Sequence, residues 1–100
     1  MKKRFEIKYS RIASFERQQI HYHIYYTRMM PLTACRYMQG MEREIKRLEY
    51  MADSRPIDIH LSQLLGVPTR RINYKKYAIL YSVEESNVYI HHIIPQSMIV

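Results

Sequence analysis

Four cations close together in the second half of the chain are its best candidates for binding an anion. They are Arg70, Arg71, Lys75 and Lys76. Residues 59–83 contain these four and no acidic residue, so the segment can hold a phosphate group or an acidic partner. Charges on an exposed strand edge also discourage other strands from pairing there, so the same cations can equally be ordinary surface residues.

Tyrosines accompany these cations along the chain. A phenol can donate or accept a proton during catalysis, and its ring can stack on a nucleobase. The chain has ten tyrosines, and those on the predicted helices are expected to pack half-buried against the core. Four tyrosines fall on the predicted strands of the second half of the chain, where they can reach a ligand: Tyr74, Tyr77, Tyr81 and Tyr89. We predict Tyr77 and Tyr81 as candidate catalytic groups.

A pair of histidines near the C-terminus is a candidate for acid–base chemistry. Adjacent residues on a strand point to opposite faces, so at most one of His91 and His92 can face a given site. His92 shares a face with Val88 and Ile90, which predicts a core histidine. His91 shares the other face with Ile93 and is the better candidate for a general acid or base.

Neither a metal site nor a cofactor site is predicted. His21 and His23 are two residues apart, whereas two ligands on one helix face lie four apart. The single cysteine, Cys35, excludes an internal disulfide and a cysteine zinc site. One unpaired cysteine also suits a reducing compartment, so we expect a cytoplasmic protein.

Length and charge restrict the class of protein further. One hundred residues, of which 47% are hydrophobic, predict a single globular domain over residues 1–100. No apolar run approaches the ~18 residues needed to cross a bilayer, and the N-terminus lacks the apolar stretch of a signal peptide. The net charge of +7, concentrated in residues 1–28 and 59–83, predicts an acidic partner such as a nucleic acid or an acidic protein.

The first half of the chain has the pattern of one strand and two helices. Residues 4–9 alternate apolar and charged side chains, which predicts a strand with one buried face. Ser14 is the predicted N-cap of a first helix that buries Ile20 and Ile24, and Pro31 marks the start of the second helix.

The second helix has the clearest periodic pattern in the chain. Its predicted buried stripe is Ala34, Met38, Met41, Ile45 and Leu48. Spacings of three and four residues place these side chains on one helix face, so the methionines are expected in the core. Gly40 interrupts the helix interior, and we expect close approach of the first helix to explain it.

The second half of the chain predicts three strands after an irregular segment over residues 57–68. The strands are expected at 70–74, 77–83 and 88–94, with a polar hairpin loop at 84–87. The resulting order is β-α-α-β-β-β. It predicts an α+β fold in which two helices pack on one face of a four-stranded, mainly antiparallel sheet.

This order resembles the RelE/ParE superfamily of type II toxin–antitoxin toxins, which includes proteins of the plasmid stabilisation type. The resemblance rests on Arg70-Arg71-Ile72, on the segment KYAILYSV at 76–83, and on Val88-Tyr89-Ile90 after an acidic turn. It covers the whole chain in architecture and about residues 66–94 in recognisable residues.

The resemblance implies two different activities. RelE-like toxins enter the ribosome and cleave mRNA without a metal, while basic side chains and a tyrosine or histidine align the scissile phosphate. ParE-like toxins instead inhibit DNA gyrase. Both kinds are neutralised by a small antitoxin, so the implied partners are an antitoxin and either the ribosome with its mRNA or gyrase, with no membrane.

The residues match the nuclease pattern only in part. Ala78 stands where RelE-like nucleases have a phosphate-binding arginine, and no arginine follows Arg71. As a nuclease, the chain would neutralise the phosphate with Arg70 and Arg71 on a concave sheet face. His91, or one of the candidate tyrosines, would then handle the 2′-hydroxyl proton.

Two further hypotheses stay open. One is a non-catalytic ParE-like gyrase inhibitor or an inactive relative that still binds an antitoxin. The other is a small RNA-binding domain. Clustering of Arg70, Arg71 and His91 in one groove would favour catalysis, and their dispersal would favour binding.

Overall fold

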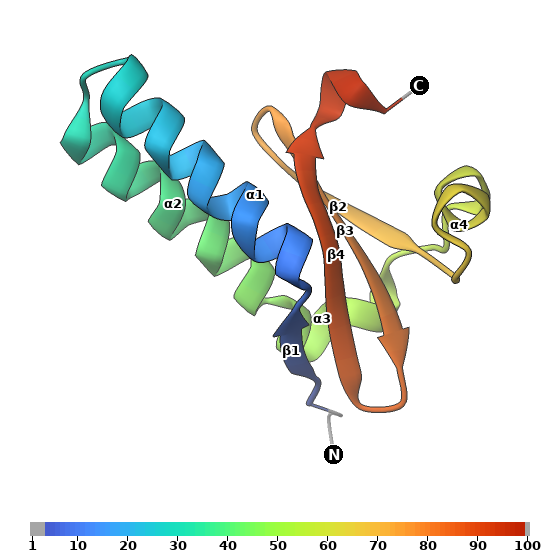
Figure 1. Ribbon diagram of the computed structural model, residues 1–100. Helices are drawn as coiled ribbons and strands as arrows, with labels where there is room; N and C mark the ends of the chain where they lie inside the picture. The colour runs from blue at the N-terminus through green and yellow to red at the C-terminus, as the bar shows by residue number, and fades with distance from the viewer. Residues whose placement is uncertain (1–3, 100) are drawn as a thin grey trace.

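A four-stranded sheet forms the centre of the molecule (Figure 1) in the computed structural model, which describes residues 4–99. The strands are β1 (Glu6–Tyr9), β2 (Arg70–Tyr74), β3 (Tyr77–Glu84) and β4 (Asn87–Pro95). Their order across the sheet is β1-β4-β3-β2. β1 runs parallel to β4, and the other two pairs are antiparallel. The predicted α+β fold is therefore confirmed, with one parallel pair in a mixed sheet.

Two helices form a long hairpin that extends beyond the sheet (Figure 1). Helix α1 (Arg11–Tyr22) continues into a π-helical segment, η1 (His23–Thr27), before the chain turns into α2 (Pro31–Lys46). Pro31 lies at the start of α2, as predicted. The predicted N-cap Ser14 is wrong: Ser10 caps α1, and its side-chain oxygen accepts from the Ala13 N–H at 2.9 Å. The helix starts earlier because Ser10 already has the extended backbone of a cap.

The predicted stripe of α2 packs against the sheet. Ala34, Met41, Ile45 and Leu48 are buried in the main core, and Met38 packs against it half-buried. The reason for Gly40 differs from the expectation. A Cβ at Gly40 would collide with the Tyr74 ring from β2, so the glycine admits a sheet tyrosine rather than α1.

A second, smaller core lies on the opposite face of the sheet. The segment predicted to be irregular contains helix α4 (Ile59–Leu65), capped by Asp58 at its start and by Gly66, in a left-handed conformation, at its end. Leu61 of α4 packs with Ala78 and Leu80 of β3. The strand β3 is thus covered on both faces, as its apolar sequence predicts.

Two short helical segments connect α2 to this region. They are α3 (Leu48–Met51) and a 3₁₀ turn, η2 (Ala52–Ser54). Another 3₁₀ turn, η3 (Gln96–Met98), follows β4. Among the described residues, no helix combines the length and apolarity that crossing a membrane requires.

A bulge in the β3–β4 ladder changes which side chains share a face. The register pairs Tyr81 with Ile90 but Leu80 with His92, so His91 is left without a direct partner. Ile93 consequently lies in the main core with Ile90. The alternation used to separate the two histidines is therefore interrupted between them, and His92 is not a core residue.

Candidate functional site

The Arg70 side chain is bound to backbone carbonyls of the segment that follows α3. One guanidinium nitrogen, Nη1, donates to the carbonyl of Asp53 at 2.9 Å and to that of Arg55 at 2.7 Å. These bonds tie β2 to the segment that follows α3. A guanidinium that already satisfies two backbone carbonyls has a structural role.

Arg71 points away from Arg70. The register places Arg70 opposite Tyr81 and Arg71 opposite Leu80, and these two β3 residues belong to different cores. The Arg71 Nε donates to Asn73 Oδ1 at 3.0 Å. The two arginines therefore lie on opposite faces of the sheet and do not form one phosphate site.

The two candidate tyrosines lie in different surroundings. Tyr81 is 0% exposed, and its hydroxyl donates to the Ala52 carbonyl at 2.7 Å. Burial raises the pKa of Tyr81 to about 12, so this phenol is a neutral core group with no access to a ligand. Tyr77 is half-buried at the start of β3. Its ring lies edge to face with that of Tyr37, with the ring centres 6.2 Å apart.

The histidines each have a partner already. His91 Nε2 lies 2.7 Å from Ser82 Oγ. His92 Nδ1 lies 3.3 Å from Glu16 Oε1, and the same carboxylate accepts the Ile93 N–H at 3.0 Å. Glu16 thus covers the edge of β4 beyond the end of β1, which explains its place on α1.

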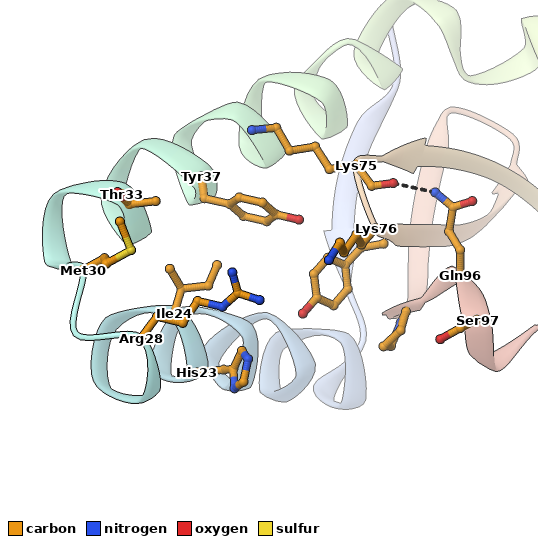
Figure 2. Close-up of a pocket in the computed structure, with 12 residues that line it drawn as sticks. His23, Ile24, Arg28, Met30, Thr33, Tyr37, Lys75, Lys76, Gln96 and Ser97 are labelled. Atoms are coloured by element: carbon orange, nitrogen blue, oxygen red, sulfur yellow. Dashed lines mark hydrogen bonds between the residues drawn. The ribbon is translucent and has the colours of Figure 1, made fainter.

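A pocket of about 620 Å³ collects the remaining predicted residues (Figure 2). It lies between the end of the helical hairpin, the β2–β3 turn and the residues after β4. Its lining includes three predicted site residues, Lys75, Lys76 and Tyr77. It also includes Arg28 and Tyr37, which were not predicted from the sequence. Arg28 belongs to the basic N-terminal part of the chain, but nothing in its spacing connects it with the turn at Lys75-Lys76.

The pocket side chains differ in how they are held. Lys75 Nζ lies 5.0 Å from the ring centre of Tyr37 and 5.5 Å from that of Tyr74, so it is engaged in cation–π contacts. Burial raises the pKa of Tyr37 and the neighbouring Tyr77 adds to the rise, whereas a hydrogen bond from the Lys76 backbone and the charge of Arg28 oppose it. Tyr37 is therefore a neutral hydrogen-bond donor at physiological pH. Among residues 4–99, no three His, Cys, Asp or Glu side chains gather as a metal site.

Comparison with solved structures relates this arrangement to a known system. Sequence comparison matches the chain to no protein family and to no curated protein. In structure, it resembles a chain of "Chromosomal ParDE TA system from P. aeruginosa" with a TM-score of 0.73 and 19% identity. The match covers 91% of this chain and 95% of that one. The chain has a ParDE-type fold. The order of elements on which the RelE/ParE resemblance rests is thus shared, as a fold, with a chain of this system, which is described as chromosomal.

On this ParDE-type fold the predicted site residues are dispersed. Arg70 and Tyr81 lie on the face of the sheet that α1 and α2 cover. Arg71 lies on the opposite face, where His91 is bonded to Ser82. Lys75, Lys76 and Tyr77 gather instead in the pocket beside the hairpin. The one cluster that this fold assembles from them contains no predicted arginine and no predicted histidine.

The partly buried His91 is expected to make stability depend on pH. Burial, with a smaller effect from His92, lowers the pKa of His91 below its ordinary 6.5, so the unfolded chain binds more protons near that pH. The contribution of neutral His91 is complete above the unfolded pKa and is lost as the pH falls. Urea unfolding at about pH 7.5 and about pH 5 should therefore give a smaller pH difference for His91→Gln than for the unmodified chain. The exposed His60 supplies the control, and an unchanged difference in His91→Gln would contradict the prediction.

Proposed function

We propose that this chain is the toxin of a type II toxin–antitoxin module and that it acts by binding a protein target. DNA gyrase is the target that the ParE-like resemblance implies. A cognate antitoxin would hold the toxin inactive. The ParDE-type fold over nearly the whole chain supports the toxin role, and the separation of Arg70 from Arg71 and His91, which lie on the opposite face of the sheet, carries the choice of binding over cleavage.

RNA cleavage by a 2′-hydroxyl needs several groups on one surface. A base must lie within hydrogen-bond reach of the hydroxyl, and cations must stabilise the charge that develops on the phosphate. Arg70 is bound to two carbonyls, Tyr81 is in the core, and Ala78 is buried where the nuclease pattern has an arginine. These three positions support binding rather than cleavage.

The exposed surface of the helical hairpin suits a protein partner. Four large side chains of α1 and η1 are more than half exposed and follow at helical spacings: Ile12, Phe15, Tyr22 and Tyr26. Apolar residues in such a row mark protein-binding surfaces more often than isolated ones do. The net charge of +7 favours an acidic partner, which suits an antitoxin.

Inducible expression in bacteria tests this proposal. Expression should stop colony formation, and co-expression of a small adjoining gene for the antitoxin should restore it. In purified systems the chain should inhibit DNA supercoiling by gyrase and leave mRNA intact on translating ribosomes. The double variant Arg71→Gln/His91→Gln should still arrest growth, because binding of the target does not require a catalytic pair.

The other outcomes separate the alternatives. Unchanged growth would overturn the toxin role. Cleaved mRNA that depends on Arg71 and His91 would overturn the binding mode in favour of the RelE-like nuclease. Affinity for free RNA that falls steeply with salt, without growth arrest, would instead support a general RNA-binding domain.

A further inference from the structure

The pocket beside the helical hairpin is built from segments far apart in the sequence. Arg28 follows η1, Tyr37 lies on α2, and Lys76 lies in the β2–β3 turn. Figure 2 shows Arg28 and Tyr37 extending from the helices toward Lys76, across the opening between the hairpin and the turn. These side chains form a concave site of about 620 Å³, a size that suits a small ligand.

The charge of the pocket is unbalanced. Among its lining residues are Arg28, Lys75 and Lys76, together with His23, and no carboxylate. In the part of the chain that the structure describes, none of the three Lys and Arg side chains pairs with an acid. Cations gathered around a concave apolar wall concentrate a positive potential there. The pocket therefore favours an anion.

Apolar and aromatic surface lines the rest of the site. Ile24, Met30 and Pro95 contribute apolar walls, and the rings of Tyr37 and Tyr77 stand edge to face in it. An inorganic anion alone would leave these walls in contact with water. A ligand that joins an anionic group to a planar apolar ring would use both the cations and the walls.

The β2–β3 turn has a strained backbone and is held by hydrogen bonds from Gln96. Lys75 has a left-handed backbone with φ of 52°, a conformation that favours glycine or asparagine. Gln96 fixes the turn from the other side, because its backbone N–H donates to the Lys76 carbonyl at 2.8 Å and its Nε2 donates to the Lys75 carbonyl at 2.7 Å. Gln96 thereby fixes the turn that places Lys76 in the lining of the pocket.

From these observations we infer that the pocket binds a nucleoside phosphate. Arg28 and Lys76 hold the phosphate, the Tyr37 hydroxyl donates to it, and the base lies against the apolar wall beside Tyr77. The ligand is either a free nucleotide or the terminal nucleotide of a strand, since both present the same groups. This site is separate from the protein-binding role proposed above.

Titration calorimetry with adenosine 5′-monophosphate tests the inference. The unmodified chain should bind this nucleotide at least tenfold more tightly than adenosine or inorganic phosphate, because each fragment uses only half of the site. Arg28→Gln/Lys76→Gln should weaken binding at least tenfold. Arg36→Gln/Arg43→Gln removes the same charge from exposed positions of α2 outside the pocket, and it should change binding less than twofold.

The remaining outcomes are decisive as well. A 5′-phosphorylated pentaadenylate that binds more tightly than the mononucleotide would assign the site to a strand end, and equal or weaker binding would assign it to a free nucleotide. An equal loss in both double variants would overturn the inference, because general charge attraction would then explain the binding. Binding of an acidic peptide without binding of the nucleotide would also overturn it. Equal thermal midpoints would show that both variants fold.

Discussion

Replacing Tyr81 by alanine is expected to lower the free energy of unfolding by about 3–5 kcal/mol, the usual cost of truncating a buried large aromatic side chain. Tyr81 is fully buried in the main core, and its hydroxyl holds the Ala52 carbonyl at the end of α3. The total free energy of unfolding of a domain of this size is about 5–15 kcal/mol, so this loss is large. Urea unfolding followed by circular dichroism measures it.

Two further variants separate the contributions of ring and hydroxyl. Tyr81→Phe keeps the ring but removes the hydrogen bond to the Ala52 carbonyl, at an expected cost of about 0.5–1.5 kcal/mol. Tyr77→Phe should change stability by less than about 0.5 kcal/mol, because Tyr77 is half-buried and its hydroxyl makes no hydrogen bond within residues 4–99. If Tyr81→Phe were as stable as the unmodified chain, the structural role of this phenol would be refuted.

Replacing Leu61 by alanine is expected to cost about 2–5 kcal/mol of unfolding free energy. Leu61 is 3% exposed and is the side chain by which α4 packs onto β3, against Ala78 and Leu80. Alanine would leave a cavity in a cluster of few residues and weaken the attachment of α4 to the sheet. Chemical denaturation measures the loss, and hydrogen exchange should show faster exchange confined at first to α4.

Leu64 on the same helix is the matched control. Its side chain is 66% exposed, so Leu64→Ala should change stability by less than about 0.5 kcal/mol. Equal effects of the two substitutions would mean that α4 does not pack as the structure shows. A loss in Leu61→Ala without faster exchange in α4 would place the damage in the rest of the sheet.

The regular elements were predictable because local patterns determine them. The stripe of α2, the alternation of β1 and the apolar run of β3 each express burial with the period of their own backbone. The helix within residues 57–68 was not predicted, because α4 is only seven residues long and its exposed Ile59 and Leu64 obscure the single buried Leu61. In hindsight Asp58 and Gly66 were the signals, as an N-cap and a left-handed C-cap.

The assignment of faces failed where the alternation itself failed. One bulge beside Tyr81 shifts the β3–β4 register, and it leaves His91 with no paired residue on β3 and places His92 opposite Leu80. An inserted residue shifts the alternation by one position, but the sequence of one strand does not show whether such a shift is a bulge. Only the pairing with the neighbouring strand shows where the extra residue lies.

The sequence by itself determined the class of fold, the basic character and the residues of the β2–β3 turn, because propensity, burial period and charge are local properties. Tertiary structure alone decided which of these residues meet. It places Tyr81 under α3 and Tyr74 against Gly40, and it brings Arg28 and Lys76 to one pocket. The members of these pairs are about 30 to 50 positions apart. They depend on how helices and strands pack, which no local pattern encodes.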